Sequence, residues 1–478
     1  MRLFLSTLTA VACGVLAACA EPEANQPPIV TAEPPSDAPP STDAPPPTDA
    51  PPPTLLRRDA EPPGPHCFGG GTAVHSGPDL DRNGTLDDAE IVATTYACTV
   101  SELFEGDFTP AMWSDPAAVT ALGQARVVIG SLAIACDAPV SLPALVLVGG
   151  SVVVSRAGTP ARFEATALAH IGGNFVVDGP GFAGDLVLPA LVRVDGGLTL
   201  RDATLPGFRA PRLTNIGGQL IARGAALAAL ELPALRTAGS VALTELAVTS
   251  VALPSMTTVL DGLRVARLPA LTLLDLPALR SVGDQLVLSE LAALRSIDLP
   301  LLGQVRDVFV TAVEASVLRL PALSVVEGHL WIVDSVDLER LTLPALNTVG
   351  RSLIVARCAL FQSLAAPLLD SVGEQDDGDD LAILLDSVDL ETLSLPRLRS
   401  APGGVRVTAT SLSALELPAL SRTSLLQLED NAYLTAVALP ALSAVDFAAI
   451  DAPALRDLSL SALATVSQRL EIRNTQLA

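Results

Sequence analysis

A block of about 22 residues repeats roughly fifteen times between Ala125 and the C-terminus, and this period constrains the fold more than any other feature. One clear copy runs from Leu338 to Val355 around a Leu-Pro-Ala-Leu core. Its apolar residues alternate with polar ones over short stretches and are Leu341, Leu343, Leu346, Val349, Leu353 and Val355. Alternation over so few residues is typical of short β-strands that bury one face.

Proline and glycine recur in nearly every copy of the repeat. Both residues would interrupt a helix, whereas proline suits the end of a strand and glycine suits a turn with positive φ. Helical repeats are therefore disfavoured. We predict an all-β domain over residues 125–478, a parallel β-solenoid of about 15 coils with roughly 22–23 residues in each.

Equivalent positions of neighbouring coils are expected to stack into columns. Leu353 and Val355 would point into the core, and the residue between them would point outward. In four successive copies this outward position is apolar, namely at Val287, Phe309, Trp331 and Ile354. Outward positions are normally polar, so this column is a candidate binding face for a protein or glycan. Simple ladder packing, or cover by a neighbouring loop, is the structural alternative, and a one-residue slip in register would turn the column inward.

The order Leu-x-x-Leu-x-Leu-Pro-x-Leu-x-x-Val/Ile-Gly-Gly-x-Leu-x-Ile is seen in copies such as Leu188 to Leu200 and Ala210 to Leu220. It resembles the receptor L-domain repeat, a leucine-rich right-handed β-helix of insulin and growth-factor receptor ectodomains and of some fungal cell-wall proteins. The receptors' disulfide-rich modules are absent here, and the array is longer than one such domain. Bacterial surface leucine-rich repeats of the 23-residue type are the nearest alternative. The resemblance implies a right-handed solenoid and a binding role, without a ligand.

The N-terminus has the features of a lipoprotein signal. Arg2 and an apolar run from Leu3 to Leu16 precede small residues and Cys19. Residues 1–18 are therefore predicted to be a signal peptide, and Cys19 to carry lipid that anchors the chain to a membrane. An ordinary secretory signal that contains a cysteine is the alternative. Ala20 is not the aspartate that retains lipoproteins at the inner membrane of enteric bacteria, which by resemblance implies the outer membrane or cell surface within the envelope.

Residues 19–65 are rich in proline and contain a near-repeat from Thr42 to Thr54. Such a segment cannot bury a core, and proline extends it into polyproline II at about 3.1 Å per residue. We predict a tether or stalk. A ligand for a proline-binding partner is the alternative.

Residues 66–100 contain an acidic loop with the spacing D-x-[DN]-x-[DN]-G-x5-E. It resembles loop–helix calcium modules of the EF-hand type, and a structural Ca²⁺ ion is the expected cofactor. A short helix would begin between Asp87 and Thr95, while Gly69 to Gly71 excludes an entering helix. An acidic turn without an ion is the alternative. The expected oxygen ligands are the side chains of Asp79, Asp81, Asn83, Asp87 and Glu90 and the backbone carbonyl of Thr85.

The remaining cysteines and the chain segments beside the repeat suggest structural roles. Cys67 and Cys98 frame the acidic loop and are expected to form a disulfide in an oxidising compartment, whereas Cys136 and Cys358 lie about ten coils apart and are expected to be buried thiols. Residues 101–124 are predicted to cap the solenoid with a helix that starts after Asp115 and ends near Gly123. The acidic run at residues 374–380 is predicted to be a solvated loop, with a second calcium site as the alternative.

The formal charge of −23 and the absence of lysine argue against nucleic-acid binding, which needs a basic surface. No serine-nucleophile motif, metal-spaced histidine pair or phosphate-binding glycine loop is visible, so an enzyme is not expected. The predicted function is noncovalent binding by a cell-surface lipoprotein, as in adhesion or receptor-like recognition. A structural envelope protein that self-associates is the alternative, and a polysaccharide-degrading β-helix enzyme is a third possibility.

Overall fold

The computed structural model describes residues 52–62, 71–98, 102–135, 138–154, 162–179, 184–202, 205–224, 227–374 and 381–477. The signal peptide, Cys19 and most of the proline-rich segment lie outside these residues. The chain divides into two compact units, one up to Leu103 and one from Phe104 onward. In the part of the chain described here, no helix has the length and hydropathy needed to span a bilayer.

The first unit contains a three-stranded antiparallel sheet in the order β1 (Thr54–Glu61), β2 (Gly71–Pro78) and β3 (Ala93–Cys98). β1 pairs with β2 along its whole length, so these eight residues belong to the module although the predicted tether extended to residue 65. The segment is free of proline and alternates between exposed and half-buried side chains, which suits a strand.

The predicted helix after the acidic loop is also replaced by other structure. A single 3₁₀ turn, η1 (Asp88–Glu90), is followed directly by β3. β3 carries Thr94, Thr95 and Tyr96, and β-branched and aromatic residues fit a half-buried sheet better than a helix. The acidic loop therefore connects β2 to β3, and the module is a small antiparallel sheet with this loop at one end of the two strands.

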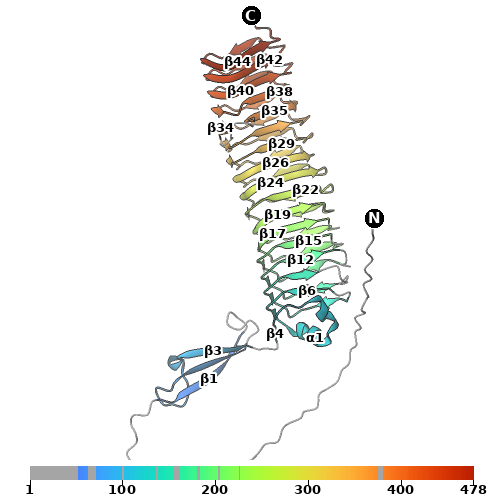
Figure 1. Ribbon diagram of the computed structural model, residues 1–478, viewed down its shortest axis with the longest axis vertical. Helices are drawn as coiled ribbons and strands as arrows, with labels where there is room; N and C mark the ends of the chain where they lie inside the picture. Colours follow the sequence, from blue (N-terminus) through green and yellow to red (C-terminus); the bar gives the residue numbers. More distant parts are fainter. Residues whose placement is uncertain are drawn as a thin grey trace, which may run out of the picture. The chain divides into compact units, whose positions relative to one another are not determined.

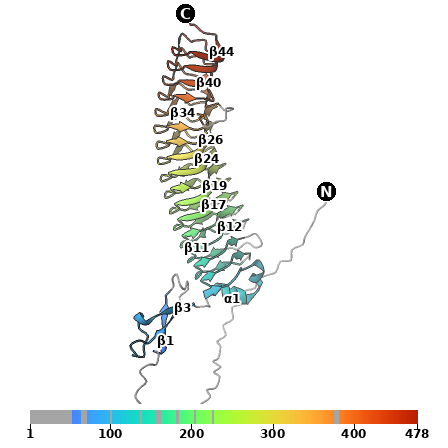
Figure 2. The ribbon, with the colours of Figure 1, turned by 60° about the vertical axis from the view of Figure 1, so that its left-hand side comes forward.

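The second unit confirms the predicted all-β parallel solenoid and has about 16 turns. Figures 1 and 2 show the turns stacked as successive rungs. The extra rung comes from the predicted cap, because Phe104 and Phe108 already bond to the first coil: Ile129 N–H donates to Phe104 O at 3.0 Å and Phe108 N–H donates to Ser131 O at 2.8 Å.

Among the described residues, the principal sheet of the solenoid has 26 strands, and most coils contribute either two short strands or one longer, bent strand. The strands are β4 (Leu103–Phe104), β5 (Val127–Val128), β6 (Leu132–Ile134), β8 (Leu147–Val148), β9 (Val152–Val154), β11 (His170–Ile171), β12 (Phe175–Asp178), β14 (Arg193–Val194), β15 (Leu198–Arg201), β17 (Asn215–Arg223), β19 (Thr237–Thr244), β21 (Thr258–Val259), β22 (Leu263–Ala266), β24 (Ser281–Leu291), β26 (Gln304–Val313), β28 (Val325–Val326), β29 (Leu330–Val333), β31 (Thr348–Val349), β32 (Leu353–Ala356), β34 (Ser371–Val372), β35 (Ile383–Val388), β37 (Ser400–Ala401), β38 (Val405–Thr410), β40 (Arg422–Glu429), β42 (Ala444–Asp451) and β44 (Thr465–Arg473).

A second face is formed by one short strand per coil, just before the Leu-Pro-Ala-Leu turn. These strands are β7 (Val140–Ser141), β10 (Phe163–Glu164), β13 (Leu186–Val187), β16 (Gly207–Arg209), β18 (Ala229–Glu231), β20 (Ser250–Ala252), β23 (Leu273–Asp275), β25 (Ser296–Asp298), β27 (Val317–Arg319), β30 (Arg340–Thr342), β33 (Ser363–Ala365), β36 (Thr392–Ser394), β39 (Ala414–Glu416), β41 (Ala436–Ala438) and β43 (Asp457–Ser459).

The core between these faces consists of columns of identical repeat positions. Leu330 pairs in parallel register with Leu353, and Ile332 pairs with Val355. All four side chains are buried, as are their equivalents on β24 and β26. The predicted inward ladders and their register are thus confirmed.

The glycines at the bend of the principal sheet serve a different purpose from the predicted positive-φ turn. A Cβ on Gly149 would lie 2.3 Å from Ile129 O, and one on Gly172 would lie 2.2 Å from Gly149 O. Neither glycine is among the residues with positive φ. Glycine is needed here because the backbones of successive coils approach too closely for a side chain.

Gly373 and Gly404 are bend glycines that do have positive φ, but positive φ is found mainly at the corner at the end of the principal sheet, largely at residues other than glycine. Two of these corners are held by ion pairs between coils, Arg267 to Glu245 at 2.7 Å and Arg357 to Asp334 at 2.6 Å. A left-handed conformation costs a non-glycine residue about 1 kcal/mol, so the stacking of coils must maintain it. The corner residues are Asp202, Glu245, Arg267, Glu290, Ala312, Asp334, Arg357, Ser387, Ala409, Asp430 and Asn474.

The helix predicted to precede the first coil is present. A 3₁₀ turn, η3 (Pro110–Ser114), leads into helix α1 (Pro116–Gln124), whose first turn is capped by the Asp115 side chain accepting from Ala117 N–H at 2.9 Å. Phe108 is fully buried, and Trp113 Nε1–H donates to Ala133 O at 2.8 Å. These contacts cover the apolar end of the first coil.

Candidate functional site

Two places in the described chain could bind a ligand, and the first is the acidic loop between β2 and β3. The carboxylate oxygens of Asp79, Asp81 and Glu90 lie within 4.8 Å of one another. Asp79 is 3% exposed and Glu90 is 6% exposed, so two of the three carboxylates are buried. Within the described residues, no ion pair reaches any of the three.

Backbone N–H groups hold these carboxylates in place. Asp79 accepts from Asn83 N–H at 3.1 Å and from Gly84 N–H at 3.0 Å. Glu90 accepts from Leu80 N–H at 2.7 Å and from Asp87 N–H at 3.1 Å. Gly84 has a φ of +79°, which favours glycine at the sharp turn of the loop.

The other predicted ligands line the outer side of the same loop. Asn83, Thr85 and Asp87 are exposed. Asn83 Nδ2 donates to Asp81 at 2.8 Å and to Asp87 at 3.0 Å, so its amide links both carboxylates. The structure thus brings Asp79, Asp81 and Glu90 together, with Asn83 and Asp87 beside them.

Two residues outside the motif fix the loop to the sheet. Arg57 on β1 donates to Leu86 O at 2.9 Å and to Asp88 at 2.6 Å. The hydrogen bond to Asp88 is the main reason that the pKa of Arg57 is raised. A Cβ on Gly77 would lie 1.8 Å from Glu90 O, so only glycine admits the loop backbone at this point of β2. Neither contact is encoded in the loop spacing, which is why sequence reasoning missed both residues.

The loop fits a hard cation by its donor set. Ca²⁺ takes six to eight oxygen ligands, largely from carboxylates and carbonyls. Three carboxylates placed close together repel one another, and a cation would remove that repulsion. The residues present therefore suit calcium and would hold it through Asp79, Asp81 and Glu90.

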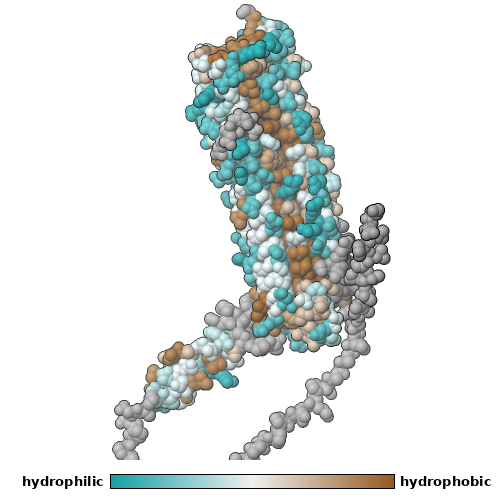
Figure 3. Space-filling view, in the orientation of Figure 1, coloured by the Kyte–Doolittle hydropathy of each residue, from teal (hydrophilic) through white to brown (hydrophobic). Residues whose placement is uncertain are grey.

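The second place is the predicted outward column of the solenoid. Parallel pairing puts Val287 beside Phe309, Phe309 beside Trp331, and Trp331 beside Ile354. All four side chains are half-buried. The predicted register is therefore correct. Figure 3 shows hydrophobic residues forming a band along the solenoid on the side in view.

The column continues beyond the predicted set. Leu384 pairs with Ile354 and extends the apolar run, which Arg264 and Arg406 border at its two ends. Leu384 was missed because the acidic insertion at residues 374–380 lengthens the repeat there. Nearly all of that insertion lies outside the described residues.

Aliphatic members of the column are accounted for by ladder packing, since Val153 and Val176 occupy the same position on earlier coils. The aromatic members differ. Phe309 and Trp331 make an edge contact with ring centroids 5.3 Å apart, and Trp331 lies 4.8 Å from the His329 ring. The distinctive part of the face is this aromatic cluster of Phe309, His329 and Trp331.

A buried serine fixes two rings of the cluster. Trp331 Nε1–H donates to Ser352 Oγ at 2.7 Å, and His329 Nδ1 lies 2.7 Å from the same oxygen. Ser352 is 1% exposed. An indole N–H can only donate, so Ser352 accepts from Trp331 and is free to donate its own hydrogen to His329. These two hydrogen-bond contacts fix the orientation of both rings.

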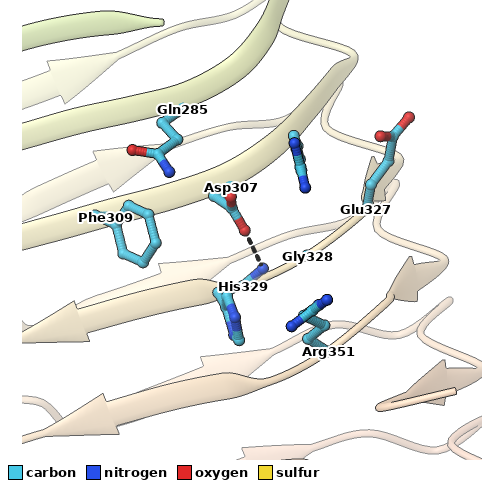
Figure 4. Close-up of a pocket in the computed structure, with 8 residues that line it drawn as sticks. Gln285, Asp307, Phe309, Glu327, Gly328, His329 and Arg351 are labelled. Carbon is cyan, nitrogen blue, oxygen red and sulfur yellow. Dashed lines mark hydrogen bonds between the residues drawn. The ribbon is translucent and has the colours of Figure 1, made fainter. Parts of the chain in front are cut away.

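A pocket of about 450 Å³ opens beside the aromatic cluster. Figure 4 shows side chains from successive rungs around it, including Asp307, Phe309 and His329. Asp307 is 7% exposed and accepts from His329 N–H at 2.7 Å. The signal that could have located this pocket is the position two residues before the outward column, which holds Asp307 before Phe309 and His329 before Trp331.

The cysteine predictions are tested only at one position. Cys358 is buried, as predicted, and burial raises the pKa of its thiol to about 11. A thiol that stays protonated is a poor nucleophile. Cys67, Cys136 and the side chain of Cys98 lie outside the described part of the chain, and the predicted disulfide lies there with them.

One family model matches part of the chain, and the match covers the small module. No curated protein matches the chain. Residues 54–98, which span β1 to β3 and include the acidic loop, match the family described as "Domain of unknown function (DUF7151)".

Proposed function

We propose that this chain is a lipid-anchored protein of the cell envelope that holds a rigid β-solenoid on a proline-rich stalk and binds a protein or glycan noncovalently. Cys19 carries the lipid, and the outer membrane or cell surface is the location. The proposal is receptor-like or adhesive recognition, in keeping with the L-domain resemblance of the repeat. The observation that carries it is the aromatic cluster on the outward column, oriented by Ser352. Preorganised aromatic side chains on a rigid face are characteristic of binding surfaces.

Binding to whole cells and to a glycan array tests this proposal. The full chain carrying Cys19→Ser is used, because that substitution removes the lipid site. Trp331→Ala and Phe309→Ala are expected to weaken binding at least tenfold, since each removes part of the aromatic cluster. Val176→Ala is the matched control, because Val176 occupies the same column and its neighbours in that column, Val153 and Thr199, are not aromatic.

Equal binding by Trp331→Ala and the parent would contradict the proposed face, provided that both give the same circular dichroism spectrum. Absence of binding by the parent to every cell and glycan would contradict recognition as the function. The chain is proposed to bind without catalysis, so incubation with bound glycans should release no new reducing ends.

Self-association as a structural envelope protein is the second candidate, and one strand favours it. β44 pairs with β42 along one edge, and no described strand pairs with its other edge. Val466, Leu470 and Ile472 on β44 are 36–41% exposed. An open edge with apolar side chains can pair with another chain. A monomer at all concentrations in sedimentation equilibrium would contradict this candidate.

We also propose that the acidic loop binds one structural Ca²⁺ ion. The convergence of Asp79, Asp81 and Glu90, two of them buried, supports this. Calcium at 100 times its dissociation constant would stabilise the module by about 2.7 kcal/mol. Titration calorimetry should show one site that is lost in Glu90→Gln and kept in Asp88→Asn, because Asp88 faces Arg57 and is outside the proposed ligand set.

A further inference from the structure

We propose that the pocket beside Phe309 binds a neutral hexopyranose unit of a glycan. This inference rests on the proposed function and names the ligand class of the same face. It follows from four observations on the pocket: an apolar wall, a buried carboxylate, a balance of charges and a rigid frame.

The apolar wall is formed by Phe309 and His329, whose ring centroids are 6.4 Å apart. Both rings also contact Trp331, with centroid distances of 5.3 Å for Phe309 and 4.8 Å for His329. A pyranose ring has an apolar face of C–H groups that packs on an aromatic surface. The wall therefore offers a platform for one sugar ring.

The polar side of the pocket is built around Asp307. One of its oxygens, Oδ1, accepts from His329 N–H at 2.7 Å. No described residue donates to the other oxygen, Oδ2, and Asp307 as a residue is 7% exposed. An acceptor that lines the pocket and has no donor among the described residues can accept from a hydroxyl group at the edge of a sugar ring.

Gly328 makes room for this carboxylate. A Cβ at position 328 would lie 2.1 Å from Asp307 Oδ1. The hydrogen bond from His329 N–H therefore depends on glycine at the preceding residue. The position of the Asp307 carboxylate is thus set by residues of two neighbouring coils.

The charges around the pocket argue for a neutral ligand. Arg306 and Arg351 contribute two positive charges, and Asp307 and Glu327 contribute two negative charges. An anionic ligand would gain from the arginines and lose to the two carboxylates. A polyhydroxylated neutral ligand can donate to the carboxylates and accept from the guanidinium groups, so it uses all four side chains.

The frame of the pocket is rigid because its residues lie on or beside strands that are paired on both sides. Phe309 on β26 pairs with Val287 and Trp331. Ser352, itself buried, orients His329 and Trp331. The pocket volume of about 450 Å³ lies within the range of small-molecule sites.

Saturation-transfer NMR and calorimetry with the Cys19→Ser chain test the inference. The probes are the methyl glycosides of glucose, galactose and mannose and their disaccharides, with glucuronic and galacturonic acid as charged comparisons. At least one neutral probe is expected to bind, and Asp307→Asn is expected to weaken it at least tenfold. Asp298→Asn is the control, because Asp298 is an exposed acidic residue on the second face.

Arg351→Ala is a second test of the pocket, for the case that Asp307→Asn does not fold. Arg351 lines the same pocket and is exposed, so its removal should not disturb the core. It should weaken binding by a similar factor and leave the circular dichroism spectrum unchanged. Tighter binding of the uronic acids than of the neutral sugars would overturn the neutral class. If no hexose binds while cell binding still depends on Trp331, the inference fails and the proposed function stands. If no hexose binds and cell binding does not depend on Trp331, both the inference and the proposed function fail.

Discussion

At the scale of single residues, Asn431 is the most connected polar side chain of the solenoid core. It is 0% exposed, and its Oδ1 accepts from Thr410 N–H at 3.0 Å and from Thr410 Oγ1 at 2.6 Å. Its Nδ2 donates to Val407 O at 2.8 Å. Asn431→Ala leaves three buried polar groups without a partner and should lower the free energy of unfolding by about 3 kcal/mol. Chemical denaturation measures this, and a loss as small as that of the exposed control Asn347→Ala would contradict it.

Cys358 is a residue whose ionisation should affect stability. Burial raises the pKa of its thiol from 9.0 to about 11, so the folded state holds the proton more tightly than the unfolded state. The protonated thiol therefore contributes to the free energy of unfolding. That contribution is complete below pH 9 and is lost as the pH rises toward 11, by at most about 2–3 kcal/mol. Compared with the parent, Cys358→Ala should lose less stability between pH 8.5 and pH 10.5 in denaturation curves. If the stabilities of the parent and Cys358→Ala fell equally with pH, Cys358 would not be the cause of the loss.

At the scale of elements, helix α1 shows how the solenoid protects its first coil. Asp115 caps the helix by accepting from Ala117 N–H, and Ala118 and Leu122 are the buried residues of the helix. Asp115→Ala should destabilise α1 by about 1 kcal/mol, because the cap is lost, whereas Asp115→Asn retains an acceptor. Hydrogen exchange of the α1 amides measures the difference. Equal protection in the two variants would show that packing, and not the cap, holds the helix.

At the scale of the whole solenoid, each coil contacts chiefly the coils before and after it, so coils should be interchangeable. Thr258 pairs with Ser281 and Val259 pairs with Val282, and removal of Val259 to Ser281 therefore joins equivalent positions. We expect this variant to fold with one coil fewer and to unfold a few degrees lower, because one interface between coils is lost. Removal of Val259 to Val282 is the control, since it shifts the register by one residue and turns buried side chains outward. Equal loss of folding in both variants, judged by circular dichroism and thermal unfolding, would contradict interchangeability.

The repeating features of the protein can be read from its sequence alone. The period, the parallel solenoid, the inward ladders at Leu353 and Val355 and the outward column from Val287 to Ile354 all follow from one pattern of alternation. Stacking of equivalent positions preserves that pattern from coil to coil, so a single copy is enough to infer the rest. The α1 cap was also predictable, because Asp115 and Pro116 act locally.

Features that depend on particular neighbouring residues could be established only from the folded chain. Whether residues 54–61 form a strand depends on pairing with β2, and the segment after Glu90 becomes β3 through the same sheet. The hydrogen bond from Trp331 to Ser352 joins residues about one coil apart, and the burial of Asp307 also depends on the neighbouring coil. The identities of these residues do not repeat along the solenoid. A periodic pattern encodes which positions stack, but the chemistry of a site arises from unique side chains meeting across coils, and that meeting exists only in the folded chain.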